Sequence, residues 1–131
     1  MVRKFNPTSE NPARAVQVWE ILVGKAMNRQ SVTYEILSEL MYGKKAPGVL
    51  NSVLGHVAYY CEDNGLPPLT VLVVGESSGI PGEGFRVIDA DKRDEYREQV
   101  FGCNWYDIYP PSEAELADAY KNHHQTGVAT A

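Results

Sequence analysis

The sequence predicts an α+β domain with five helices and a β-hairpin between the third and the fourth helix. In the first half of the chain, apolar residues recur every three to four positions, as in amphipathic helices. An apolar and β-branched run at residues 69–74 follows a double proline and is typical of a buried strand. A glycine-rich loop, 75–84, precedes a second strand-like run at 85–88, as in a hairpin. The length of 131 residues favours a single domain.

The first two helices carry sequence signals at their ends. Asn11-Pro12 puts a proline at the start of a helix expected over residues 12–28. Thr33 is the expected N-cap of the second helix, and Gly43 is the expected stop. The side chains that we expect this second helix to bury are Ile36, Leu37, Leu40 and Met41.

The third helix is expected over residues 47–63, after a short basic link that contains Lys44 and Lys45. Its apolar residues follow one helical stripe: Leu50, Val53, Leu54, Val57, Ala58 and Cys61. The opposite, exposed face is expected to hold Gly48, Ser52, Gly55, His56, Tyr59 and Asp63. Asn64-Gly65 is a helix stop.

The C-terminal part is expected to be helical and peripheral. A fourth, mostly charged helix is followed by an aromatic segment that we expect to pack on the core. Ser112 and Glu115 match a capping box, which predicts a last helix over 113–123. We therefore divide the chain into a core at 10–90, a helical extension at 91–124 and a frayed tail at 125–131.

Composition argues against several classes of protein. No apolar run approaches the roughly 20 residues of a membrane span, and the N-terminus lacks the apolar part of a secretory signal, so we expect a cytoplasmic protein. Cys61 and Cys103 fit no metal or redox spacing, and no cofactor or metal site is expected. Loop 75–84 lacks the lysine of a nucleotide-binding Walker loop. The net charge of −5 argues against non-specific coating with nucleic acid.

Three short helices followed by a hairpin is the element order of a winged helix-turn-helix domain, with the third helix as recognition helix and loop 75–84 as wing. Within residues 32–85 the chain contains Val32-Thr33-Tyr34, Gly43, Asn64-Gly65, Pro67-Pro68-Leu69-Thr70, the run 71–74, and a glycine-containing segment from Gly79 to Phe85. In these features residues 32–85 resemble the C-terminal winged-helix domain of the DNA alkyltransferases and alkyltransferase-like proteins.

The chain departs from that family at its reactive centre. The cysteine of the family's Pro-Cys-His-Arg run would fall at Pro68, and the next two positions are Leu69 and Thr70. Alkyl transfer needs a thiolate, so the resemblance implies a protein without this activity. The recognition-helix arginine of the alkyltransferase-like proteins is also missing, because residues 47–70 contain no Arg or Lys.

These observations favour a non-enzymatic DNA-binding protein that uses helix 47–63 and wing 75–84. The residues expected to contact DNA are Tyr34, Lys44, Lys45, Asn51, Ser52, His56, Tyr59 and Arg86, with Tyr34 at a backbone phosphate by resemblance. The alternative is a protein-interaction module or homodimer of a regulatory or defence type, which would use the face around Tyr59 and Tyr60. An enzyme of another class stays open as a third reading, supported only by polar residues near the loop.

Overall fold

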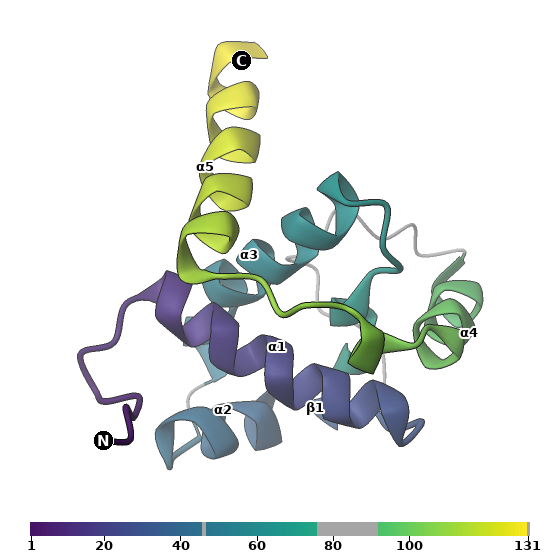
Figure 1. Ribbon diagram of the computed structural model, residues 1–131, viewed down its shortest axis with the longest axis horizontal. Coiled ribbons are helices and arrows are strands. Elements are labelled where there is room, and N and C mark those ends of the chain that lie inside the picture. Colours follow the sequence, from purple (N-terminus) through teal and green to yellow (C-terminus); the bar gives the residue numbers. More distant parts are fainter. Residues whose placement is uncertain (46, 76–91, 131) are drawn as a thin grey trace.

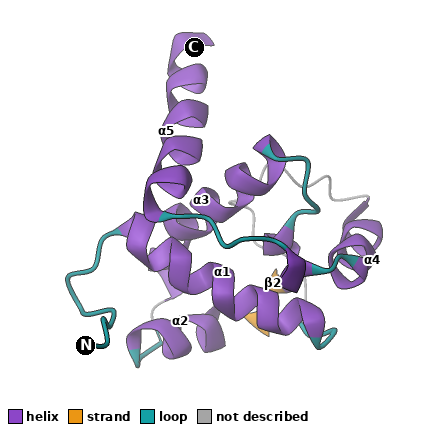
Figure 2. Cartoon of the chain, in the orientation of Figure 1, coloured by secondary structure: helices purple, strands orange, loops and turns teal. Residues whose placement is uncertain are grey.

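The computed structural model describes residues 1–45, 47–75 and 92–130. In this part of the chain the fold is α+β, with five α-helices and one small two-stranded sheet (Figures 1 and 2). The α-helices and strands are α1 (Asn11–Met27), β1 (Val32–Thr33), α2 (Tyr34–Tyr42), α3 (Leu50–Asp63), β2 (Val73–Val74), α4 (Arg93–Gly102) and α5 (Glu113–Thr130). Three 3-10 turns accompany them: η1 (Pro47–Val49), η2 (Leu69–Leu72) and η4 (Trp105–Asp107).

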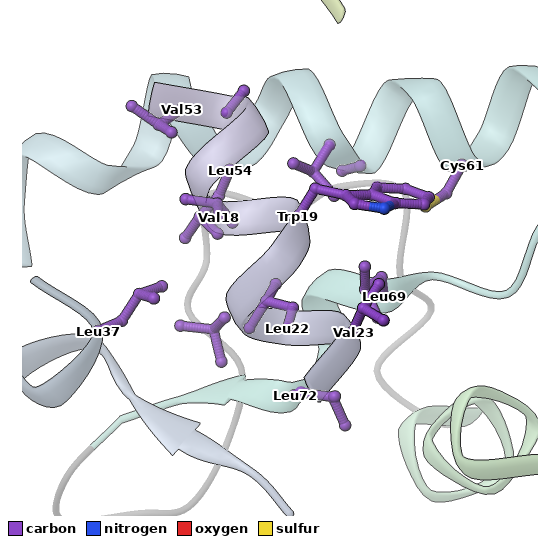
Figure 3. Packing of buried hydrophobic residues seen from close by; sticks show 14 of the residues in the cluster. Val18, Trp19, Leu22, Val23, Leu37, Val53, Leu54, Cys61, Leu69 and Leu72 are labelled. Atoms are coloured by element: carbon purple, nitrogen blue, oxygen red, sulfur yellow. The ribbon is translucent and has the colours of Figure 1, made fainter. Parts of the chain in front are cut away.

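Helix α1 forms the centre of the core and contacts α3, α5 and η2. Its apolar stripe, which includes Val18 and Leu22, is fully buried, as its helical spacing predicts. Val53 and Leu54 of α3 close one side of this stripe (Figure 3). The periodicity of α1 and α3 therefore predicted their buried faces correctly.

Trp19 of α1 joins the C-terminal segment to the core. Its ring makes edge contacts with Tyr60 at 5.7 Å and with Trp105 at 5.6 Å between ring centroids. The Trp105 indole N–H donates a 2.8 Å hydrogen bond to the Val100 carbonyl, so its polar atom is satisfied inside the protein. The expected packing of the aromatic segment is confirmed for Trp105, whereas Tyr109 is fully exposed.

The caps of α2 are as predicted, but its buried face is not. The Thr33 hydroxyl accepts the Ile36 N–H at 3.1 Å, and Gly43 ends the helix with a φ of 76°. Leu37 and Met41 are buried, whereas Ile36 and Leu40 are 48% and 53% exposed. A short helix that packs through one stripe can bury only one of two adjacent i, i+4 pairs, and the expectation for Ile36 and Leu40 was wrong.

The strand expected over residues 69–74 is mostly a turn. Residues 69–72 form the turn η2, in which the Val71 N–H donates to the Pro68 carbonyl at 3.0 Å, and only 73–74 are extended. Strand β2 pairs in parallel with β1, with Val32 opposite Val73. Prolines restrict the chain before η2 and lack an N–H, which favours a turn over a strand there. The expected return strand at 85–88 and the wing beyond residue 75 lie outside the described residues.

Helix α5 is longer than predicted. The capping box is confirmed, because the Ser112 hydroxyl accepts the Glu115 N–H at 3.1 Å and the Glu115 carboxylate accepts the Ser112 N–H at 3.0 Å. The helix runs to Thr130, so the tail expected to be frayed is helical up to that residue. No proline interrupts the chain after Pro111. Helix α5 contacts α3 and α1, and its far end points away from the body (Figure 1).

Candidate functional site

The face of α3 that was expected to meet DNA is covered by α5. The ring of His56 stacks on Tyr120 of α5, with 4.2 Å between centroids and 9° between planes. One turn along, Tyr59 stacks on His123 at 4.2 Å and 11°. His56 is only 4% exposed, so the expectation that it lies on an exposed face was wrong. We call these four residues the aromatic seam.

Two further contacts hold the aromatic seam together. A Cβ added at Gly55 would lie 3.0 Å from Cε1 of Tyr120, so the glycine leaves room for that ring. His123 Nε2 lies 2.7 Å from Asp63 Oδ1, and His123 Nδ1 lies 4.0 Å from a Glu62 carboxylate oxygen. Sequence patterning could not detect this contact, since a helical repeat does not show which distant helix covers an outer face.

The N-terminal end of α3 stays open. Asn51 is exposed and Ser52 is partly exposed, and the link before the helix exposes Lys44 and Lys45. Tyr34 is partly exposed, but it begins α2, whereas the lysines follow the end of that helix. The lysines and the start of α3 are thus exposed and close in sequence, whereas Tyr34 lies at the opposite end of α2. Arg86 lies outside the described residues.

A cleft that sequence reasoning missed lies between the N-terminal segment, α1 and the end of α2. Its volume is about 850 Å³. Four cations line it: Arg3, Lys4, Arg14 and Lys44. Among the described residues that line it, none carries a carboxylate. We call it the N-terminal cleft.

Arg14 lines this cleft although it is only 4% exposed. Its guanidinium donates to the Gln17 side-chain oxygen at 2.8 Å, to the Met41 carbonyl at 2.9 Å and to the Asn6 carbonyl at 2.7 Å. It also lies 4.6 Å from the centre of the Tyr42 ring. Burial raises the pKa of Tyr42, and the Arg14 charge partly opposes that rise. Arg14 thus fastens the N-terminal segment to the last turn of α2.

One signal in the sequence could have indicated Arg14. It stands four residues before Val18 and eight before Leu22, on the buried stripe of α1. A charged residue in register with such a stripe is rarely buried without a specific partner. The position of Arg14 therefore predicts a polar contact inside the fold, although the pattern does not identify its distant partner, the Met41 carbonyl.

Charge is distributed unevenly along the chain. Residues 1–60 contain seven Lys or Arg and four Glu, a formal charge of +3. Residues 61–131 contain five Lys or Arg and thirteen Asp or Glu, a formal charge of −8. The overall charge of −5 therefore conceals a cationic N-terminal half, which holds both the N-terminal cleft and the open end of α3.

Neither thiol is activated. Burial raises the pKa of Cys61 to about 12, with a small opposing effect from a hydrogen bond to the Leu69 backbone. Burial also raises the pKa of Cys103. A nucleophilic thiol needs a lowered pKa, so neither environment is that of a reactive cysteine. No group of three or more His, Cys, Asp or Glu side chains suited to a metal ion occurs within the described ranges.

Comparisons with known proteins do not assign the chain to a family. No protein-family model matches it, and no curated protein or solved structure matches it significantly. Among the helices that the structure describes, none has both the length and the apolar character needed to cross a membrane. A function must therefore be proposed from the exposed side chains and charges of this chain alone.

Proposed function

We propose that the chain is a non-enzymatic DNA-binding protein of the winged-helix type, which contacts DNA through the α2–α3 link and the N-terminal end of α3. The observation that carries this proposal is the exposure of Lys44, Lys45 and Asn51 in the cationic half of an acidic chain. Lysines bind backbone phosphates, and an exposed amide side chain can read a base edge.

The proposed contact surface is smaller than the one expected from the sequence. His56 and Tyr59 belong to the aromatic seam under α5 and are therefore left out of it. Recognition helices of helix-turn-helix proteins contact bases mainly with their N-terminal residues, and this end of α3 is open. A short footprint with few cations predicts weak, salt-sensitive binding.

The order of elements supports the winged-helix part of the proposal. A two-residue strand leads into α2, a turn joins α2 to α3, and a proline pair leads into η2 and a second short strand. This order is compatible with the resemblance between residues 32–85 and the alkyltransferase winged-helix domain. At the position of that family's reactive cysteine the chain has Pro68, which cannot act as a nucleophile.

A fluorescence-anisotropy titration with a short duplex tests the proposal at about 50 and 200 mM salt. We expect binding that weakens with salt, and a further loss of about three- to tenfold in the Lys44→Ala/Lys45→Ala variant. Lys121→Ala removes an exposed cation from α5 and is the matched control. Tyr59→Phe should keep wild-type affinity, because that ring packs against His123. Absence of binding to duplex at micromolar protein and low salt would reject the proposal.

A protein partner or a second copy of the chain is the second candidate. The face around Tyr59 and Tyr60 no longer supports it, because these rings pack on His123 and Trp19. The supporting observation is instead the exposed pair Ile36 and Leu40, one turn apart on α2. Sedimentation analysis tests this candidate: a concentration-dependent dimer that is lost in Leu40→Lys would favour it. A strict monomer that captures no partner in a pull-down would count against it.

A further inference from the structure

Arg14 is a buried cation without an anionic partner among the described residues. Its three hydrogen-bond acceptors among the described residues are an amide oxygen and two backbone carbonyls, all neutral. No carboxylate lies within ion-pair distance of it in the part of the chain that the structure describes. Burying a charge is costly unless the charge is paired, and neutral acceptors and a ring offset only part of that cost.

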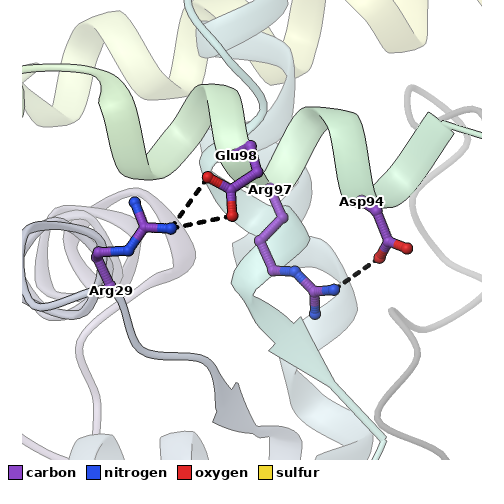
Figure 4. A network of polar contacts seen from close by, with 4 residues as sticks. All are labelled: Arg29, Asp94, Arg97 and Glu98. Atoms are coloured by element: carbon purple, nitrogen blue, oxygen red, sulfur yellow. Dashed lines mark hydrogen bonds and ion pairs between the residues drawn. The ribbon is translucent and has the colours of Figure 1, made fainter.

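Arg29, in contrast to Arg14, has both an anionic and an aromatic partner. Its guanidinium lies 3.0 Å from both carboxylate oxygens of Glu98 (Figure 4). It also lies 4.8 Å from the centre of the Phe101 ring. Arg14 has the aromatic contact, with Tyr42, but not the carboxylate. The more buried of the two arginines is therefore the one that lacks an anion.

A donor on Arg14 is also unused. Its Nε is buried and has no hydrogen-bond partner within the described ranges. Unsatisfied buried donors are rare in folded proteins, and each one calls for an explanation such as a bound ligand or ion. The Nε–H of Arg14 and its uncompensated charge point to the same missing partner, an anionic acceptor.

The surroundings of Arg14 favour an anion in the N-terminal cleft rather than elsewhere. Arg3, Lys4 and Lys44 line the same cleft and add positive charge around Arg14. A second cleft, of about 580 Å³, lies against the same N-terminal segment but contains Glu113, whose carboxylate lies 3.9 Å from Arg3. Of these two clefts, the one lined by Arg14 combines several cations with no described carboxylate.

We propose that the N-terminal cleft binds the phosphate of a nucleotide, with Arg14 as its inner ligand. A cleft of about 850 Å³ has the size of a small-molecule site and exceeds what a lone phosphate fills. The Phe5 ring, 39% exposed, lines this cleft and offers an apolar surface for a base. Arg3 and Lys4 supply further positive charge at its edge. The site takes a free nucleotide or the phosphorylated end of a nucleic acid strand, since both present the same chemistry.

This proposal does not rest on DNA binding by α3. The two proposed surfaces share Lys44 and differ in every other residue that carries them. Arg14 and Phe5 line the N-terminal cleft, whereas Lys45 and Asn51 belong to the α3 surface. Variants of the first pair should leave duplex binding unchanged, and variants of the second pair should leave nucleotide binding unchanged. Failure of one proposal is therefore distinguishable from failure of the other.

The test is a titration of the full chain with AMP and with inorganic phosphate, followed by ¹H–¹⁵N NMR up to about 10 mM ligand. We expect shifts of the amides of residues 3–7 and of the Arg14 Nε–H resonance with both ligands. Arg14→Lys keeps the charge but removes the planar guanidinium donor. It should weaken the binding of both ligands about tenfold. Phe5→Ala should weaken the binding of AMP about threefold and leave the binding of phosphate unchanged, because only AMP has a base.

Controls separate the outcomes. Lys121→Ala should bind AMP as the wild type does. The Arg3→Ala/Lys4→Ala variant removes two exposed cations, so it tests the site if Arg14→Lys does not fold. A 5′-phosphorylated oligonucleotide that binds more tightly than AMP, when its unphosphorylated form does not, identifies a strand end as the occupant. The proposal is overturned if neither ligand shifts the resonances of Arg14 and of residues 3–7. It is also overturned if the Arg14→Lys and the Arg3→Ala/Lys4→Ala variants both bind the two ligands as tightly as the wild type does.

Discussion

The aromatic seam and the N-terminal cleft differ in whether their central basic side chain, His123 or Arg14, has a carboxylate partner among the described residues. At the aromatic seam, the rings of α3 stack on those of α5, and His123 meets the Asp63 carboxylate at 2.7 Å. In the N-terminal cleft, Arg14 is buried against neutral acceptors, and the lining cations meet no described carboxylate. One region is filled by the chain itself, and the other is left open to a ligand.

This difference changes where a ligand should be sought. The pattern of α3 predicted an exposed face, but a face that carries rings and small residues is also one that another helix can cover. The N-terminal residues form one wall of a cationic cleft because Arg14 fastens them to α2. Residues that bind a ligand are better identified by a charge that lacks a partner of opposite sign than by an exposed position on a helical wheel.

Removal of Arg14 should have the largest effect. We expect Arg14→Ala to lower the free energy of unfolding by about 2–4 kcal/mol, because buried carbonyls lose their donor and a cavity forms beside Tyr42. The matched variant, Arg29→Ala, breaks an exposed ion pair and should cost less than about 1 kcal/mol. Urea denaturation measures both values. If both variants lost the same free energy of unfolding, Arg14 would not be what fastens the N-terminal segment to α2.

A methyl group at Gly55 should loosen the other region. The new Cβ would lie 3.0 Å from the Tyr120 ring, so Gly55→Ala should lower the free energy of unfolding by about 1–2 kcal/mol. Gly24 is the control: it lies inside α1, and nothing lies within 4 Å of its added Cβ. Gly24→Ala should stabilise by about 0.5–1 kcal/mol through helix propensity. Thermal or urea denaturation measures both values. If both substitutions changed the free energy of unfolding in the same direction, this would argue against close packing of α5 on α3.

A third effect concerns the inner side of α3 and is absent at neutral pH. Cys61 has a folded pKa of about 12 against an ordinary value of 9.0, so the unfolded chain releases this proton first as the pH rises. The free energy of unfolding should therefore fall between about pH 9 and pH 12. Tyr42, Tyr60 and Cys103 have raised pKa values and add to the same trend.

The thiols can be compared directly with a thiol reagent at about pH 8. Cys103 is partly exposed and should react in the native protein, whereas the buried Cys61 should react only after unfolding. The Cys103→Ser variant isolates the Cys61 reaction. Rapid labelling of Cys61 in that variant under native conditions would contradict its burial between α3 and the core.

Local signals predicted much of the fold, and contacts between distant segments account for the errors. Thr33, Gly43 and the Ser112–Glu115 capping box were correct because a cap is specified by residues within one turn of it. The exposed Ile36 and the buried His56 were missed because neighbouring elements decide which side of a helix is covered. The N-terminal cleft was missed for the same reason: its walls come from residues 3–17 and from residues 41–49, which are far apart in the sequence.

The parallel pairing of β1 with β2 has a consequence for folding kinetics. Each strand has two residues, and the chain between them contains all of α2 and α3. Closing so long a loop costs conformational entropy that two short strands cannot recover alone. We therefore expect this pairing to form after α1 and α3 have docked, as a late event that follows nucleation by the helices.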